Sequence, residues 1–261
     1  PLGARRAVGR TAEIYAWRDR QVLKLFYDWM PAGAAEYEAG LARAAHSAGL
    51  PAPAVGELVR VEGRRGILFA RADGPTLGND LHRRPWRLIR AARLLAELHA
   101  GMHALTAPGL PAQRERLRAR LRSAGPLPDD LRAALLAALE RLPDGDRVCH
   151  GDFHPENVLL TPGGPVIIDW IDATGGHPLA DVARTCLLMG GAPLPRPSLP
   201  ARIEAWASQR FVALYLKHYF ALRPGGQEQL ADWEPLVAAA RLSEGIVEEE
   251  ARLLALARRV A

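Results

Sequence analysis

Stretches in which apolar and polar residues alternate fill the first part of the chain. Residues 12–18 and 21–27 follow the two-residue period of half-buried strands, and residues 55–61 and 65–71 do the same across Glu62 and Gly63. Between these pairs, residues 34–48 follow a helical period that ends at Gly49, with prolines beyond it. The pattern predicts a small antiparallel sheet with one helix.

From residue 78 onward the pattern is helical. Apolar residues share one face of residues 86–105, which predicts a helix there. Further helices are predicted at residues 112–123, 129–142, 178–189, 202–222 and 227–259, the last interrupted near Gly245. We therefore predict an α+β fold, with a β-rich region at residues 1–71 and a larger, mostly helical region at residues 72–261.

Within the helical region, one short hairpin interrupts the pattern. Residues 158–160 and 166–168 are aliphatic runs joined by a Thr-Pro-Gly-Gly turn. Asn157 precedes the first strand and Asp169 follows the second, so both lie at the same end of the ribbon, and Asp152 comes five positions before Asn157. Carboxylate and amide oxygens are ligands for a hard cation such as Mg²⁺, which completes its shell with water and phosphate oxygens.

The spacing His150-x-Asp152, four residues, Asn157, and then Asp169 resembles the catalytic loop and metal-binding Asp of the protein-kinase-like superfamily. The form with His154 and Asp169-Trp170-Ile171 is similar to the aminoglycoside phosphotransferase and choline kinase-like branch, a family of small-molecule phosphotransferases. The resemblance implies a bilobal kinase-like fold, with residues 1–71 as the nucleotide-binding lobe. It also implies that Asp152 is the catalytic residue and that Asn157 and Asp169 bind Mg²⁺.

The same resemblance implies roles for residues outside the motif. Lys24 is expected to contact the α- and β-phosphates of ATP or GTP, with Glu38 on the inward face of the predicted helix as its ion-pair partner. Only two lysines occur in this arginine-rich chain, which favours a need for a compact ammonium at position 24. The remaining implied roles are nucleotide binding by Gly9 in a degenerate glycine loop and by Phe69 and Arg71 near the adenine, and support of the catalytic loop by His150 and Asp181.

Several of these residues have simpler interpretations. Asp181 falls in the first turn of a predicted helix, where the helix dipole alone favours a carboxylate, although bracing of the catalytic loop is the preferred role. His99 and His103 have the i,i+4 spacing of a zinc pair, but no third ligand follows nearby, so packing is favoured. Cys149 and Cys186 lie in apolar runs without metal or disulfide spacing, which favours buried thiols in a reducing cytosol.

Charge is unevenly distributed along the chain. The net charge is +5, yet residues 144–181 carry seven acids and one arginine. This acidic stretch suits a site for a metal and a cationic substrate. Acidic candidates for acceptor binding are Asp172, Glu156, Glu244 and the run Glu248-Glu249-Glu250, although three consecutive glutamates on a helix also fit a solvated helix face. Residues 114–122 contain five arginines, with Leu117 and Leu121 at i,i+4, so an amphipathic helix with a solvated basic face is favoured over nucleic-acid binding.

These observations predict an enzyme that transfers the γ-phosphate of ATP or GTP, with Mg²⁺, to a hydroxyl of a small molecule such as an aminoglycoside. Only twelve positions separate Asp169 from Asp181, too few for a peptide-binding activation segment, so a protein kinase is a weaker alternative. A catalytically silent nucleotide-binding pseudokinase is the other. The chain shows no apolar run that could span a bilayer and no leader pattern. A cytoplasmic monomer or homodimer that contacts neither membrane nor nucleic acid is expected.

Overall fold

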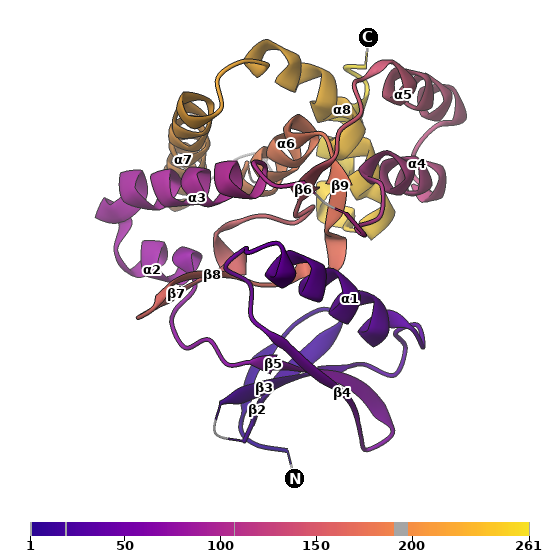
Figure 1. Ribbon diagram of the computed structural model, residues 1–261. Helices are drawn as coiled ribbons and strands as arrows, with labels where there is room; N and C mark the ends of the chain where they lie inside the picture. The colour runs from indigo at the N-terminus through magenta and orange to yellow at the C-terminus, as the bar shows by residue number, and fades with distance from the viewer. Residues whose placement is uncertain (1, 19, 107, 191–197, 261) are drawn as a thin grey trace. The chain divides into compact units, whose positions relative to one another are not determined.

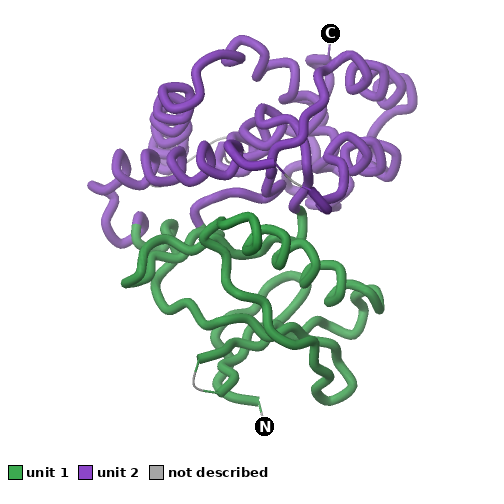
Figure 2. The backbone as a smooth tube through the Cα atoms, viewed as in Figure 1, with its two compact units in different colours: residues 1–80, 156–172 green, residues 81–155, 173–261 purple. Residues whose placement is uncertain are grey.

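The structure, a computed structural model, describes residues 2–18, 20–106, 108–190 and 198–260. The chain forms two compact units, Pro1–Asp80 with Glu156–Asp172 (unit 1) and Leu81–Pro155 with Ala173–Ala261 (unit 2) (Figure 2). The predicted division cuts the chain at one place, after residue 71. In the structure, each unit instead combines two separate stretches of the chain. The central motif is therefore shared, because Asp152 belongs to unit 2 and both Asn157 and Asp169 belong to unit 1.

Unit 1 contains an antiparallel five-stranded sheet with strand order β1-β2-β3-β5-β4 (Figure 1). The strands are β1 (Arg5–Val8), β2 (Ala12–Trp17), β3 (Gln21–Phe26), β4 (Val55–Val61) and β5 (Arg64–Ala70). Four of them lie where the alternation predicted them. The pattern missed β1, because all four of its residues are exposed and it shows no alternation to detect.

The two faces of the sheet bury different residues. Leu23 and Leu25 pack on one face with Leu68, whereas Phe26 and Ile67 pack on the other face with Ala35 of helix α1 (Ala34–Ser47). Successive side chains of a strand point to opposite faces. Lys24, which lies between Leu23 and Leu25, therefore points to the face that α1 covers.

A second small sheet in unit 1 is the hairpin of β7 (Val158–Thr161) and β8 (Gly164–Ile167). Ile167 N donates to Pro51 O at 2.7 Å and Leu160 N donates to Pro75 O at 2.9 Å, so the hairpin is attached to the segments that follow α1 and β5. After β8 comes a short 3₁₀ turn, η3 (Trp170–Asp172), which packs on α1. Segments far apart in sequence thus form one core.

Unit 2 is mostly helical (Figure 1). Its helices are α3 (Leu88–Met102), α4 (Gln113–Ser123), α5 (Asp129–Arg141), α6 (Pro178–Met189), α7 (Leu199–Leu222), α8 (Leu230–Arg241) and α9 (Val247–Ala257), and helix α2 (Leu77–Arg83) spans the boundary with unit 1. The strands β6 (Arg147–Cys149) and β9 (Thr174–Gly176) pair antiparallel. The helical period located every one of the long helices to within a few residues.

The buried face of α3 is the predicted one. Ala92, Leu95, His99 and Met102 are all fully buried. The arginine-rich stretch forms α4, which buries Leu117 and Leu121, as an amphipathic helix requires. No helix in the described ranges is both long enough and apolar enough to cross a bilayer.

Candidate active site

In unit 1 the predicted nucleotide-binding residues Lys24 and Glu38 meet the predicted metal ligand Asp169 in one ion-pair cluster. Lys24 Nζ lies 2.7 Å from Glu38 Oε1 and 2.9 Å from Asp169 Oδ1. Lys24 and Glu38 are buried, whereas the Asp169 side chain is 40% exposed. The cluster therefore joins an anchored lysine to a carboxylate that remains accessible.

The charges of this cluster depend on one another. Burial lowers the pKa of the Lys24 ammonium, but the carboxylates of Asp169 and Glu38 outweigh burial and raise that pKa above its ordinary value. Burial raises the pKa of Glu38, against the effect of Lys24. Within the described residues Glu38 Oε2 is buried and lacks a hydrogen-bond partner. Lys24 is therefore held as a cation, at the cost of one incompletely satisfied carboxylate.

The β7–β8 hairpin positions the two predicted metal ligands. Val158 pairs with Ile167, and Ile168 N donates to Asn157 O at 3.0 Å, so the residues flanking the hairpin lie at one end of the ribbon, as predicted. Asp169 has a φ of +65°, a conformation that Asp tolerates better than most residues. Such strain is concentrated at functional sites. An accessible carboxylate and a nearby amide fit the oxygen ligands of Mg²⁺.

In unit 2 the loop that carries Asp152 is fixed by helix α6. Asp181 accepts hydrogen bonds from His150 N at 2.6 Å and Gly151 N at 2.8 Å. Thr185 Oγ1 donates to Phe153 O at 2.9 Å. The contacts implied for Asp181 are thus present, and the helix dipole is not its only role. His150 itself is fully buried, and its Nδ1 accepts a hydrogen bond from Asp152 N at 3.2 Å.

Asp152 is held as a carboxylate. Its Oδ2 lies 3.6 Å from His154 Nε2 and its Oδ1 lies 3.5 Å from Arg184 Nη2. Burial would raise the pKa of the Asp152 carboxyl, but the hydrogen bond from His154 and the charge of Arg184 outweigh burial and hold the pKa well below its usual range. The group therefore stays ionised at neutral pH and is a weak base.

Two histidines, His99 and His103, lie behind this loop. Their Nε2 atoms lie 3.0 Å and 3.3 Å from Asp181 Oδ2, and their Nδ1 atoms lie 2.6 Å and 2.7 Å from the hydroxyls of Tyr215 and Tyr219. These three side chains have ligand atoms close enough for a metal. Each ring nitrogen already has a hydrogen-bond partner, however, so the cluster is complete as a buried polar network. Asp181 supplies the third ligand type that the local sequence lacked, and the preference for packing or capping over zinc stays a prediction.

The structure places the other predicted nucleotide-site residues in unit 1. Gly9 is exposed in the turn between β1 and β2, and Phe69 is half-buried near the end of β5. Arg71 N donates to Arg20 O at 2.9 Å, so this N–H is already used within the protein. The adenine roles of Phe69 and Arg71 stay predictions.

The predicted acceptor residues lie in different elements. Glu156 accepts a hydrogen bond from Thr76 Oγ1 at 2.5 Å, and the same Oγ1 accepts from Asn79 N at the start of α2. Asp172 is half-buried in η3, and Glu248 is exposed in the first turn of α9. Glu156 thus has a structural partner, and so has Glu244, which accepts hydrogen bonds from Arg184 and Arg241. Acceptor binding by these residues stays a prediction.

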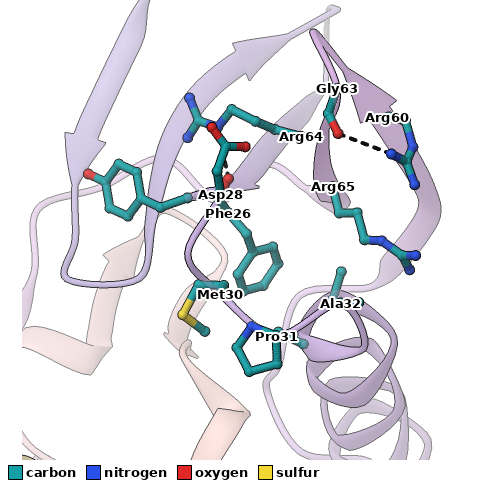
Figure 3. A pocket seen from close by; sticks show the side chains of 12 residues that line it. Phe26, Asp28, Met30, Pro31, Ala32, Arg60, Gly63, Arg64 and Arg65 are labelled. Carbon is teal, nitrogen blue, oxygen red and sulfur yellow. Dashed lines mark hydrogen bonds between the residues drawn. The ribbon is translucent and has the colours of Figure 1, made fainter.

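A separate small pocket in unit 1 is lined mainly by the end of β3, the start of α1 and the β4–β5 turn (Figure 3). Phe26, Met30 and Arg65 are among its lining residues, and Arg60 Nη1 donates across the turn to Gly63 O at 3.2 Å. None of the predicted site residues lines it. No role in phosphate transfer is therefore assigned to this pocket.

Comparison with known proteins agrees with this geometry. The model of the family described as "Phosphotransferase enzyme family" matches residues 7–228. The chain belongs to this family. The match confirms the predicted enzyme class, a phosphotransferase, and the kinase-like branch that the motif indicated. No curated protein has a sequence that matches this chain.

Solved structures of members of the same branch share the fold. An aminoglycoside-3'-phosphotransferase of type VIII is 21% identical, with 90% of each chain covered and a TM-score of 0.63. Aminoglycoside phosphotransferase APH(4)-Ia, in a ternary complex with AMP-PNP and hygromycin B, is 18% identical over 98% of this chain and 90% of its own, with a TM-score of 0.65. A choline/ethanolamine kinase family protein from Mesorhizobium loti is 18% identical over 99% and 86%, with a TM-score of 0.61. These likenesses confirm the predicted fold class.

Sequence reasoning missed Arg184, which contacts Asp152, and the tyrosines Tyr215 and Tyr219 behind the histidines. Arg184 is the single basic residue of α6 and lies three positions after Asp181, and this spacing was a usable signal. The tyrosines lie 116 residues from the histidines that they contact. No local pattern predicts a contact between residues so far apart.

Proposed function

We propose that this phosphotransferase transfers the γ-phosphate of ATP or GTP, as a magnesium complex, to a hydroxyl of a small molecule. The observation that carries the proposal is the cluster in which buried Lys24 contacts both Glu38 and the accessible Asp169. A lysine fixed in this way offers its ammonium to nucleotide phosphates. The AMP-PNP in the complex of the similar aminoglycoside phosphotransferase supports a nucleotide co-substrate.

The residues of unit 1 bind and neutralise the nucleotide. Lys24 contacts the phosphates, while Asn157 and Asp169 hold Mg²⁺. The metal, when bound, neutralises charge on the phosphate oxygens and so stabilises the transition state. Glu38 keeps the lysine in place because its contact at 2.7 Å is the shortest that Lys24 makes in the described structure.

Asp152 orients the acceptor. As the acceptor oxygen bonds to the γ-phosphorus, the bond from that phosphorus to the bridging oxygen breaks and the nucleoside diphosphate leaves. The acceptor hydroxyl gives its proton to Asp152, which later releases it to water. Because the pKa of Asp152 is held low, the proton moves late in the reaction and the main contribution of Asp152 is orientation.

The class of acceptor is proposed mainly from the similar solved structures. Hygromycin B in one similar structure and the choline/ethanolamine kinase family of another make aminoglycosides and amino alcohols the first acceptors to test. The acidic side chains of Asp172 and Glu248 suit a cationic acceptor. Both residues are proposed as contacts for the acceptor's amino groups.

The test is nucleotide turnover with Mg²⁺ and a panel of aminoglycosides, macrolides, amino alcohols and sugars. Asp152→Asn is the blank, because it keeps the size of the side chain and removes its charge. One acceptor that raises wild-type turnover at least about a hundredfold above the blank would support the proposal, since positioned acid–base groups contribute about 10²–10⁴-fold. Phosphate found only on added protein would indicate a protein kinase. Nucleotide binding with equal turnover in both proteins would indicate a pseudokinase.

A further inference from the structure

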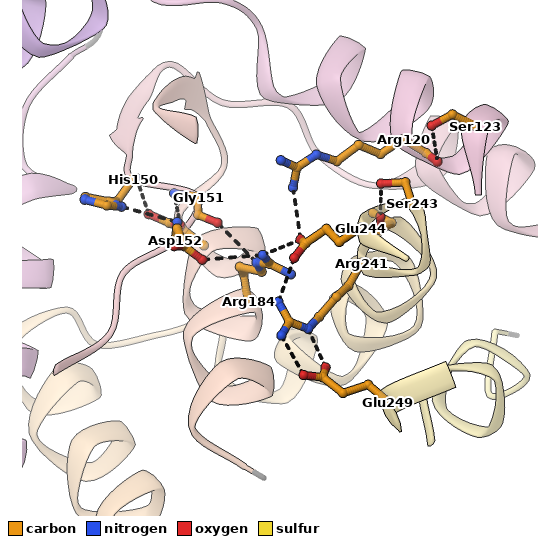
Figure 4. A network of polar contacts seen from close by, with 12 residues as sticks. Arg120, Ser123, His150, Gly151, Asp152, Arg184, Arg241, Ser243, Glu244 and Glu249 are labelled. Carbon is orange, nitrogen blue, oxygen red and sulfur yellow. Dashed lines mark hydrogen bonds and ion pairs between the residues drawn. The ribbon is translucent and has the colours of Figure 1, made fainter. Parts of the chain in front are cut away.

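A buried arginine in unit 2 contacts both the backbone and the side chain of the catalytic loop (Figure 4). Arg184, on the same face of α6 as Asp181 and Thr185, donates from Nε to Gly151 O at 3.1 Å. Its Nη2 lies 3.5 Å from Asp152 Oδ1 and its side chain is only 7% exposed. Arg184 thus contacts Asp152, which orients the proposed acceptor, and Gly151, the residue before it.

A chain of alternating charges extends from Arg184 toward the C-terminal helices. Glu244 Oε1 accepts from Arg184 Nη2 at 2.6 Å, and Glu244 Oε2 accepts from Arg241 Nη1 at 2.9 Å. Arg241 in turn makes a two-pronged contact with Glu249 of α9. Glu244 and Asp152 thus share Nη2 of Arg184, and the shorter contact to Glu244 fixes the nitrogen that also contacts Asp152.

The unfavourable free energy of burying the Arg184 guanidinium indicates that Arg184 has more than a structural role. Arg184 Nη1 is buried and lacks a hydrogen-bond partner in the described part of the chain. A buried charge with an unsatisfied donor is expensive, and apolar side chains stabilise such positions as well or better. Arg cannot lose its proton, however, and so it places a permanent positive charge beside the Asp152 carboxylate.

We propose that Arg184 is a positioning residue for phosphoryl transfer, which fixes Asp152 by holding its Oδ1 and the carbonyl of Gly151 at the same time. Rotation of the carboxylate is then restricted, and Oδ2, on the side of His154, is presented to the acceptor hydroxyl. Glu244 acts through Arg184 by fixing its guanidinium. The inference rests on the proposed function, because it assumes that Asp152 orients the acceptor.

The experiment compares Arg184→Gln, Asp152→Asn and the double variant in the full-length chain. The readouts are the kcat and the nucleotide KM for hydrolysis of Mg-ATP and Mg-GTP to water, a reaction that requires no identified acceptor, and the urea midpoint. Arg184→Lys is the conservative variant, since it keeps the charge and loses the planar fork. Arg132→Gln is the matched control, because Arg132 also braces backbone carbonyls, those of residues 121, 122, 124 and 127, without contacting Asp152.

Arg184→Gln is expected to lower kcat about 10- to 100-fold, since misplacement of a reacting group by about 1 Å costs on the order of 10²-fold, with nucleotide KM within about twofold. Arg184→Lys is expected to retain an intermediate rate. In the Asp152→Asn background, Arg184→Gln should change kcat by less than about twofold, because residues that act through one another are not additive. Arg132→Gln should leave kcat within about twofold in either background.

Two results would overturn the inference. One is an Arg184→Gln variant whose kcat equals that of wild type. The other is an Arg184→Gln substitution that lowers kcat by the same factor in the wild-type and Asp152→Asn backgrounds, because an arginine with only a structural role would have this effect. If Arg184→Gln does not fold, Arg184→Lys decides by the same comparison. A failure of the proposed function looks different, because wild type and Asp152→Asn would then hydrolyse the nucleotide at the same rate.

Discussion

At the scale of single residues, Lys24 shows how far pattern and spacing determine a site. Strand alternation places it on the face opposite Leu23 and Leu25, and helical periodicity places Glu38 on the inward face of α1. The contact of 2.7 Å between them follows from those two facts. The second partner, Asp169, is 145 residues away, and only the resemblance of the motif connected it with Lys24.

Replacement of Lys24 tests this cluster as a structural unit. Lys24→Met leaves Glu38 buried without its partner, which should lower the free energy of unfolding by about 3–5 kcal/mol at neutral pH. The loss should shrink as the pH falls, because Glu38 can then take up a proton and become neutral. Urea unfolding between pH 5 and 8 measures both effects. The control Lys24→Met with Glu38→Gln should recover most of the stability, and a single variant as stable as wild type would contradict the argument.

At the scale of elements, the sequence predicted α3, α6 and α7 but not the network that joins them. Hydrophobic periodicity gives the buried face of each helix, and that face of α3 includes His99, while His103 is buried directly after the last helical residue. It does not tell which helices pack together. The hydroxyls of Tyr215 and Tyr219 reach the two histidines because α3 and α7 pack against each other, which brings residues 99 and 103 beside residues 215 and 219. Helix packing of this kind is a property of the folded chain and leaves no local signal.

The buried side chain of His103 predicts acid sensitivity. Burial, together with the neighbouring His99, lowers the pKa of His103 from its ordinary value to about 3. In the unfolded chain His103 takes up a proton below about pH 6.5, whereas in the folded chain it stays neutral. The unfolded state then binds more protons, so the free energy of unfolding falls with falling pH, by at most about 1.4 kcal/mol per pH unit from this group between pH 6.5 and 3.

Comparison of His103→Gln with wild type isolates this effect. The variant lacks the group, so its stability relative to wild type should rise as the pH is lowered from 7 to 4.5, even if it is less stable at pH 7. Urea unfolding at each pH gives the difference. His82→Gln, which removes an exposed imidazole on α2, is the control for the substitution itself. A constant difference for His103→Gln would show that His103 gains no proton on unfolding.

At the scale of the whole molecule, the division of the chain was the feature least accessible to sequence. Secondary structure suggested a break after residue 71, where the pattern changes from strands to helices. Unit 1 instead also includes residues 156–172 (Figure 2), because the β7–β8 hairpin bonds to Pro51 and Pro75 and the turn with Trp170 packs on α1. Asp169, the second ion-pair partner of Lys24, belongs to unit 1 because residues 156–172 belong to it.

This composition predicts which fragments fold. Residues 1–80 alone lack Asp169 and the fully buried side chain of Trp170, whose loss costs on the order of 3–5 kcal/mol, so they should not unfold cooperatively. Joining residues 1–80 to residues 156–172 through a short Gly/Ser linker should restore cooperative unfolding. A short linker is sufficient because Thr76 lies within 2.5 Å of Glu156, near both ends to be joined.

Circular dichroism during urea titration measures the cooperativity of each fragment. The joined fragment with Trp170→Ala is the matched control, because it has the second stretch without its main buried side chain, and it should unfold at a lower urea concentration than the joined fragment. Cooperative unfolding of residues 1–80 alone, at the midpoint of the joined fragment, would contradict the prediction. It would mean that residues 156–172 pack on unit 1 without stabilising it. The first eighty residues would then already contain a complete core.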